Sequence, residues 1–209
     1  MSNAAACVSA TPFQPDETQV IRPAMHHVNL KTTRLQEMID WYATVIGTRP
    51  NYRSEVVAFL TNDDASHRIA LMELPGLKDD DEKVTRTGMH HTAFEYEKLD
   101  DLLASYLRLR NAGILPGACL DHGPAMSFYY IDPDANMLEL QADNYGDWEA
   151  STAFVRDDAR FGVNPIGAFI DPEQIVAARR GGLTPWEIHE RALRGDYPAT
   201  LPIDFRLPL

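Results

Sequence analysis

Hydrophobic and polar positions run through one order of predicted elements twice along this chain. In the first run, residues 24–32 alternate as in a strand, and a helical spacing of apolar residues follows. Its members are Leu35, Met38, Ile39, Tyr42, Val45 and Ile46. Gly47 predicts the end of that helix. Strand-like stretches at 55–60 and 68–74 come next, with a short extra strand near Tyr52.

The second run begins after a charged linker at 78–84. A strand is predicted at 89–96, and a helix that ends near Gly113 follows. The apolar side of this helix consists of Leu99, Leu102, Leu103, Tyr106, Leu107 and Leu109. Further strands are predicted at 127–131 and 136–141, joined by a turn that contains proline and aspartate.

The repeat predicts an α+β fold with three parts. Residues 1–23 form an N-terminal arm, residues 24–147 form the domain, and residues 148–209 form a C-terminal extension. Within the domain, modules 24–75 and 88–143 are copies of one supersecondary unit. One copy alone leaves a sheet face bare, so we expect the two to form a curved, barrel-like mixed sheet.

The C-terminal extension breaks the repeat. Asp171 and Thr184 each precede a proline, Pro172 and Pro185, in the order that favours a capped helix start. We expect the extension to cover a sheet edge, the mouth of a pocket or a neighbouring subunit.

Composition excludes several classes of partner. A net charge of −12 over 209 residues argues against a nucleic acid or an anionic membrane. Cys7 and Cys119 make no disulfide framework, so we expect a reducing, cytoplasmic location. Residues 1–19 have neither the basic start nor the apolar run of a signal peptide or membrane span. An uncovered sheet edge favours a homodimer or a larger homo-oligomer.

Candidate chemistry lies in two His-His pairs, each followed at a similar distance by a glutamate. Glu73 comes 46 residues after His27, and Glu139 comes 48 residues after His91. Side chains alternate between the two faces of a strand, and this parity puts His27, His91 and Glu139 on the concave face. Glu73 joins them by analogy. The first histidine of each pair has the opposite parity and is expected to be structural.

These residues resemble the vicinal oxygen chelate superfamily, which includes glyoxalase I, fosfomycin-resistance proteins, bleomycin-binding proteins and extradiol ring-cleaving dioxygenases. The resemblance covers residues 24–145 and implies βαβββ modules around a metal site. The family's ligand positions match His27, His91 and Glu139. This 2-His-1-carboxylate set suits Fe(II) and leaves positions open for substrate and O₂.

Three further segments resemble the extradiol branch. The strand that opens with Ser66-His67 is similar to one that carries an active-site histidine, here His67. Asp121-His122-Gly123 is similar to a loop that bears another, here His122. The strand at 127–133 is similar to one whose tyrosine touches the substrate, here Tyr129. The resemblance implies a compact two-module enzyme that opens the ring of a small aromatic diol of the catechol type.

Two alternatives stay open. If Glu73 is a fourth ligand, the set also resembles the glyoxalase I site, which would suit Zn²⁺ or Ni²⁺ and an isomerisation by proton transfer. Mn²⁺ is a further alternative to iron. Some members of the superfamily bind and sequester a small molecule without catalysis, which is the second alternative.

Overall fold

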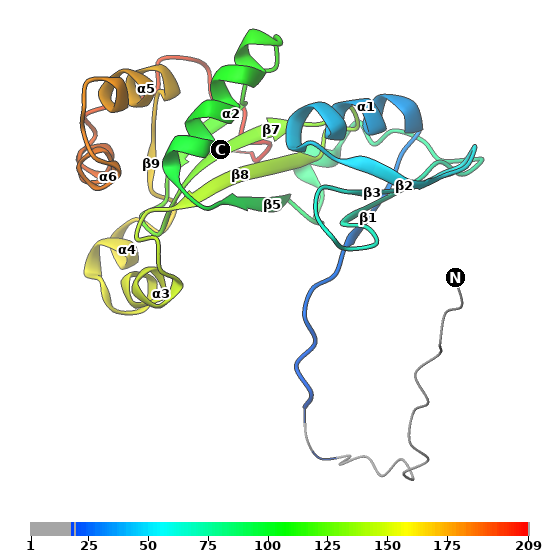
Figure 1. Cartoon of the computed structure of the whole chain (residues 1–209), viewed down its shortest axis with the longest axis horizontal. Helices are drawn as coiled ribbons and strands as arrows, with labels where there is room; N and C mark the ends of the chain where they lie inside the picture. The colour runs from blue at the N-terminus through cyan, green and yellow to red at the C-terminus, as the bar shows by residue number, and fades with distance from the viewer. Residues whose placement is uncertain (1–17, 19, 209) are drawn as a thin grey trace, which may run out of the picture.

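Two βαβββ modules form the centre of the molecule, as the repeat predicts (Figure 1). This computed structural model describes residues 18 and 20–208. Most of the predicted arm, and Cys7, lie outside the described residues. The first module consists of β1 (Val28–Lys31), α1 (Leu35–Ile46), β2 (Arg49–Arg53), β3 (Val57–Thr61) and β4 (Ile69–Met72). After a 3₁₀ turn, Lys83–Thr85, the second consists of β5 (His91–Tyr96), α2 (Leu99–Asn111), β6 (Ala118–Asp121), β7 (Ala125–Ile131) and β8 (Met137–Asp143).

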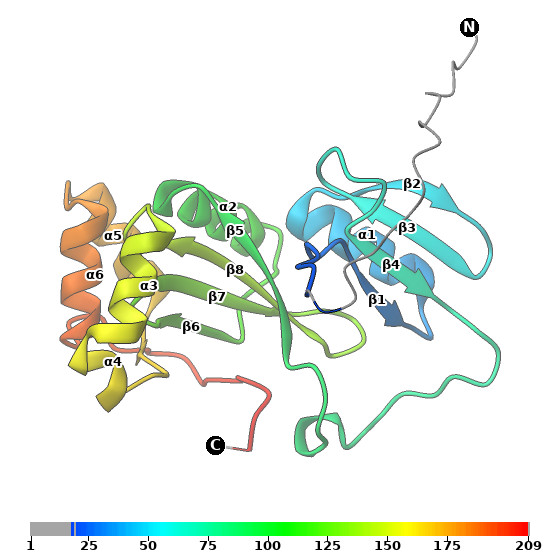
Figure 2. The same cartoon turned by 90° about the horizontal axis from the view of Figure 1, so that it is seen from below.

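Each module forms its own mixed sheet. The strand orders are β1-β4-β3-β2 and β5-β8-β7-β6-β9, and in both modules the first strand runs parallel to the last. The expected α+β fold of two such modules is confirmed, and the two sheets stay unclosed and separate (Figure 2). The modules are held together by helices and loops rather than by strand pairing.

One apolar core joins the modules on the helix side of both sheets. The inner faces of α1 and α2 pack there with residues of both sheets, and both helices lie on the same side of the molecule (Figure 1). Arg108 of α2 donates hydrogen bonds to the carbonyls of Thr44 and Val45, at 2.6 and 3.0 Å. These bonds satisfy carbonyls near the end of α1 that have no partner within the helix. Neither helix covers the opposite face of either sheet.

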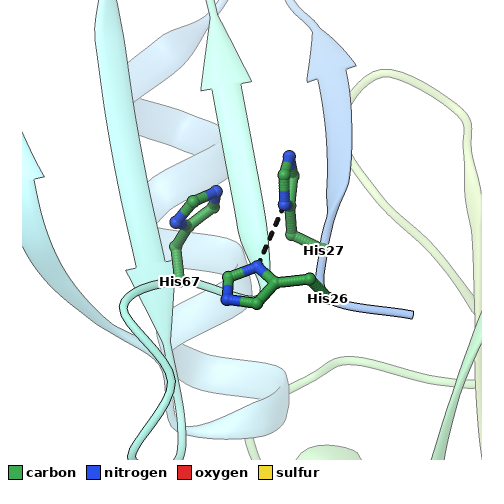
Figure 3. A group of neighbouring side chains, drawn as sticks. All are labelled: His26, His27 and His67. Atoms are coloured by element: carbon green, nitrogen blue, oxygen red, sulfur yellow. Dashed lines mark hydrogen bonds between the residues drawn. The ribbon is translucent and has the colours of Figure 1, made fainter. Parts of the chain in front are cut away.

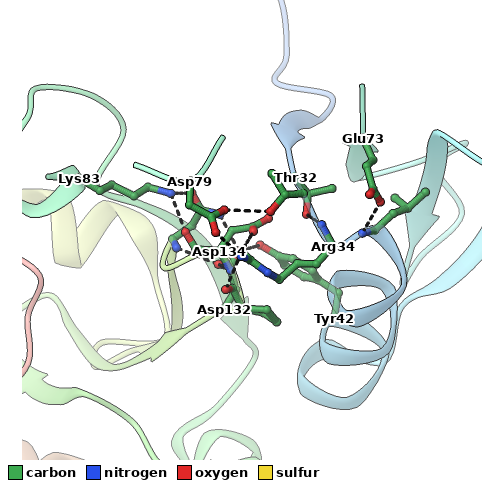
Figure 4. Close-up of polar contacts among 12 residues, drawn as sticks. Thr32, Arg34, Tyr42, Glu73, Asp79, Lys83, Asp132 and Asp134 are labelled. Carbon is green, nitrogen blue, oxygen red and sulfur yellow. Dashed lines mark hydrogen bonds and ion pairs between the residues drawn. The ribbon is translucent and has the colours of Figure 1, made fainter. Parts of the chain in front are cut away.

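A buried polar contact adds to this junction. The Tyr42 hydroxyl donates to Asp132 at 3.1 Å, and Arg34 pairs with Asp134 and with the Pro133 carbonyl (Figure 4). Burial raises the pKa of Asp132, despite the hydrogen bonds that the carboxylate accepts. The hydrogen bonds satisfy a carboxylate that would otherwise be costly to bury.

The C-terminal extension packs against the second module. It consists of α3 (Trp148–Asp157), α4 (Ala159–Val163), β9 (Ala168–Phe169), α5 (Pro172–Arg180), α6 (Pro185–Leu193) and a final extended stretch. Strand β9 pairs antiparallel with β6, so the extension covers the edge of the second sheet, one of the three expected roles. Both predicted helix starts are confirmed: Asp171 caps α5, and Thr184 caps α6 in a capping box with Glu187. Among the described residues, no helix is long and apolar enough to cross a membrane.

Candidate active site

His91 and Glu139 lie side by side on the face of the second sheet that α2 does not cover. Strands β5 and β8 are parallel, and their register pairs His91 with Met137 and Ala93 with Glu139, which puts both side chains on one face. His91 Nε2 lies 3.0 Å from Glu139 Oε2. Burial raises the pKa of Glu139, but the hydrogen bonds from His91 and Tyr129 outweigh it and hold the pKa below its usual value. Two of the three predicted ligands are thus adjacent.

Tyr129 of β7 binds the other oxygen of Glu139. The two residues are direct cross-strand neighbours, and the Tyr129 hydroxyl donates to Glu139 Oε1 at 2.8 Å. The phenol is 2% exposed. Burial, and then the negative charge of Glu139, raise the pKa of Tyr129, so the hydroxyl keeps its proton. The adjacent Tyr130 faces the core instead, which agrees with the expectation that one of the two faces the pocket.

His122 completes a continuous hydrogen-bonded chain. Its Nε2 lies 2.9 Å from the Tyr129 hydroxyl, and its Nδ1 lies 2.6 Å from the carbonyl oxygen of Ile166 in the C-terminal extension. The chain therefore runs from His91 through Glu139, Tyr129 and His122 to the extension. Four of the seven residues predicted as ligands or active-site groups, Glu73 included, are brought together here.

Apolar side chains surround this network. Phe205, from the final stretch of the chain, packs edge-on against Tyr129 with ring centroids 4.8 Å apart, and it also contacts Phe169. Met137 of β8 belongs to the same cluster. The Phe205 carbonyl lies 2.8 Å from Nε2 of His90, which agrees with the structural role expected for the first histidine of that pair.

The first module holds a second group, made of histidines alone. The rings of His27 and His67 lie 4.2 Å apart, and His26 Nδ1 lies 3.1 Å from His27 Nδ1 (Figure 3). Ligand atoms of all three lie within 4.8 Å of one another. Phe59 stacks on His67 at 4.8 Å. Burial, followed by the nearby charges of His27 and His26, lowers the pKa of His67.

His27 does not lie within that distance of both His91 and Glu139. Across residues 18 and 20–208, the histidine triplet of the first module is the group of three potential ligands that meets the 4.8 Å limit. Two members of the predicted set, His91 and Glu139, thus lie together in the second module, and the third, His27, lies in the first. His26 belongs to this triplet, and the structural role that strand parity predicts for it stays a prediction.

Glu73 does not share the face of Glu139, and the expectation that it does is wrong. The register of β1 with β4 pairs Asn29 with Ala70, whereas the equivalent pair in the second module is Ala93 with Glu139. Ala70 is therefore the counterpart of Glu139. Glu73 lies three residues beyond Ala70, so its parity points it to the helix side of the sheet.

The carboxylate of Glu73 binds the start of α1. Its Oε2 accepts a hydrogen bond from the backbone N–H of Leu35 at 2.8 Å (Figure 4). Arg34, at the N-cap position, makes no side-chain cap of its own. Glu73 thus satisfies a helix N–H that has no partner within the helix and places negative charge at the helix N-terminus.

Sequence reasoning missed a buried pair behind His122. His189 of α6 and Asp121 of β6 are both fully buried, with His189 Nδ1 2.9 Å from Asp121 Oδ2. A histidine in an amphipathic helix gives no periodic signal of such a contact. Asp121 was visible only as the first residue of the Asp-His-Gly segment.

Residues 24–140 match the family model described as the Glyoxalase/Bleomycin resistance protein/Dioxygenase superfamily. Biphenyl-2,3-diol 1,2-dioxygenase 3 of Rhodococcus globerulus is 36% identical over 172 residues, which are 82% of this chain and 90% of the relative. Biphenyl-2,3-diol 1,2-dioxygenase 2 of the same organism is 38% identical over 160 residues, 77% of this chain and 83% of the relative. Both alignments extend well beyond the half of the chain that forms the two modules.

A solved structure supports the fold of the two modules. A glyoxylase/bleomycin resistance protein/dioxygenase domain from Frankia sp. EAN1pec superimposes with a TM-score of 0.51 at 23% identity. The match covers 59% of this chain and 93% of that chain.

Proposed function

Because the chain belongs to the glyoxalase/bleomycin resistance protein/dioxygenase superfamily, we propose that it is an extradiol dioxygenase that opens the ring of an aryl-substituted catechol. The observation that carries this proposal is the hydrogen-bonded chain of His91, Glu139, Tyr129 and His122. It joins a carboxylate–histidine ligand pair to two groups that can bind and protonate a substrate oxygen.

Fe(II) is the metal that we propose, held by His27, His91 and Glu139. The donor set fits this ion because one carboxylate and two imidazoles are the ligands of non-haem Fe(II) oxygenases. Glu139 suits the role, since its pKa lies below the usual value and it stays ionised despite its burial. When bound, the metal acidifies the catechol hydroxyls and provides the electronic path between the aromatic ring and O₂.

Tyr129 would hold the substrate rather than take its proton. A phenol whose pKa is raised by burial and by a neighbouring carboxylate donates hydrogen bonds and does not serve as a base near neutral pH. The fixed contact with Glu139 places this phenol next to a ligand. Because its single hydrogen goes to Glu139, the Tyr129 oxygen would orient the substrate by accepting a hydrogen bond from a catechol hydroxyl at the metal site.

His122 is suited to donate a proton. The Ile166 carbonyl can only accept, so Nδ1 of His122 carries a hydrogen. Nε2 of His122 lies 2.9 Å from the Tyr129 hydroxyl, where it could take up a proton from a bound catechol and later return it. We assign His122 as the proton donor to an oxygen of the opening ring. His67, beside His27, would stabilise negative charge on an oxygen held there.

The contact of Glu73 with α1 weighs against a four-ligand, glyoxalase-like site. In the first module the counterpart of Glu139 is Ala70, whose methyl group cannot bind a metal. Three protein ligands leave room for a bidentate diol and O₂, and four would not. The glyoxalase I alternative is therefore less well supported than the dioxygenase.

We propose an aryl substituent on the substrate because aromatic side chains surround Tyr129. Phe205 and Phe169 offer aromatic edges against which a second ring can pack. Both Rhodococcus relatives are named for biphenyl-2,3-diol, a catechol with a phenyl substituent.

Ring cleavage can be tested directly. Protein reconstituted with Fe(II) without oxygen is mixed with biphenyl-2,3-diol or unsubstituted catechol in air-saturated buffer. We expect a yellow ring-fission product and equimolar O₂ uptake, with the phenyl-substituted diol preferred. Absence of O₂ uptake, together with Ni²⁺- or Zn²⁺-dependent turnover of a hemithioacetal, would contradict the proposal.

A further inference from the structure

Helix α6 places a fully buried histidine, His189, against the loop that carries His122. His189 Nδ1 lies 2.9 Å from Asp121 Oδ2, and neither side chain is exposed. The other buried residues of α6, Ile188 and Ala192, are apolar, so packing alone does not call for an imidazole at this position. Asp121 directly precedes His122 in the chain.

Hydrogen bonds around Asp121 show which atom donates. Asp121 Oδ1 accepts from the Gly123 N–H at 2.9 Å and from the Asn144 amide at 3.1 Å. The second amide hydrogen of Asn144 goes to the Gly123 carbonyl at 3.0 Å. Asn144 Nδ2 also lies 3.1 Å from His189 Nδ1, but both of its hydrogens are used and a carboxylate can only accept, so His189 Nδ1 donates to Asp121. The carboxylate is held on both oxygens.

Other parts of the C-terminal extension pack against the same loop. Gly167 approaches so tightly that a Cβ there would lie 2.1 Å from the Asp121 carbonyl oxygen and 2.6 Å from the His122 Cα. A Cβ on Gly123 would lie 2.3 Å from the Phe154 ring. With the Ile166 carbonyl on His122 Nδ1, the extension contacts this loop from α3, from α6 and from the residues just before β9.

We propose that His189 is a positioning residue that acts on His122 through Asp121. The inference rests on the proposed function, because it gives His122 the role of proton donor. Without His189, Asp121 Oδ2 is a buried charge that has lost its partner, which favours rearrangement of the loop. A shift of about 1 Å in a group that handles a proton can reduce turnover about a hundredfold.

Three variants separate positioning from general stability. His189→Ala removes the donor, and His189→Asn restores one, because an asparagine amide can occupy the place of Nδ1. Ile188→Ala truncates a neighbouring buried side chain that makes no polar contact. We expect His189→Ala to lower kcat by about tenfold to a hundredfold with the iron content unchanged. We expect His189→Asn to recover most of the loss, and Ile188→Ala to change kcat less than about twofold.

The His122→Asn background decides the route of the effect. If His189 acts through His122, His189→Ala causes no further loss of kcat there, because the two changes remove one function. Multiplying losses, or an equal loss in Ile188→Ala, would overturn the proposal.

A second readout does not depend on turnover. In protein with isotope-labelled histidine, the His122 ring signals are assigned by their absence in His122→Asn. We expect His189→Ala to shift them and His189→Asn to leave them near their original positions, whereas unmoved signals in His189→Ala would refute the positioning role. If the wild-type enzyme opens no catechol, the proposed function fails, but this measurement still tests the contact.

Discussion

Replacing Glu73 separates a helix cap from a metal ligand. In the structure this carboxylate accepts the Leu35 N–H at 2.8 Å at the start of α1. Loss of a capping hydrogen bond costs about 0.5–2 kcal/mol, and loss of negative charge at a helix N-terminus costs about 0.3–1 kcal/mol. Because Glu73 is only partly buried, we expect Glu73→Ala to lower the free energy of unfolding by about 1–2 kcal/mol.

Thermal unfolding and iron content report the two roles separately. For a chain of this size, 1 kcal/mol corresponds to about 2–4 °C, so Tm should fall by about 2–8 °C in Glu73→Ala. Glu73→Gln keeps an oxygen that can accept the Leu35 N–H, so we expect a smaller loss. Bound iron and kcat at a temperature below both transitions should match the wild type in both variants. An iron-depleted variant with an unchanged Tm would refute the reasoning and favour a four-ligand site.

Three further predictions concern the phenol, an acid-sensitive contact and the apolar wall. Tyr129→Phe should lower kcat by about tenfold or more while iron stays bound, as measured by steady-state kinetics and metal analysis. Hydrogen bonding from Tyr106, and then from Arg110, holds the pKa of Glu173 below its usual value. Its stabilising effect is therefore complete above the pKa of the unfolded carboxyl and is lost as the pH falls through the lower folded pKa. The free energy of unfolding, measured with urea at about pH 7 and about pH 3, should differ less between the two pH values in Glu173→Gln than in the wild type. An equal difference in both proteins would argue against this role of Glu173. Phe205→Ala should raise KM for biphenyl-2,3-diol about two- to tenfold more than for catechol. Equal changes for the two substrates would contradict the proposed packing of Phe205 against the phenyl substituent.

The two-module architecture could be predicted because each module repeats the same periodic order. Helix α1 buries Leu35, Met38 and Tyr42 at helical spacing, and Gly47 adopts a φ of 69° just after it, as a helix end requires. Family membership and the dioxygenase assignment are confirmed by the relatives. Strand β6 could not be predicted from the hydrophobic pattern because all four of its residues are buried. Such a strand lacks the alternation that marks a half-exposed strand.

Strand register explains why counting residues from His27 and from His91 does not lead to equivalent positions in the two modules. Glu73 and Glu139 lie at similar offsets from His27 and His91, but strand pairing makes Ala70 the equivalent of Glu139. The loops between strands differ in length, so equal offsets do not mean equal positions. A shift by an odd number of residues moves a side chain to the other face of the sheet.

Contacts made by the extension could not be predicted from sequence for a different reason. His189 and Asp121 are 68 residues apart and meet only because α6 folds back over the end of β6. Local patterns carry no information about such a long-range pair. That Tyr129 and His122 lie beside Glu139 could be predicted because they fall within segments that resemble a known enzyme branch, and their roles stay predictions.

The position of iron decides between the two histidine arrangements. Crystals of protein loaded with Fe(II) without oxygen, measured at the iron absorption edge, would locate the ion by its anomalous scattering. The account predicts one iron bound by His27, His91 and Glu139, with Glu73 still at the start of α1. Iron held instead by His26, His27 and His67, away from Glu139, would contradict it.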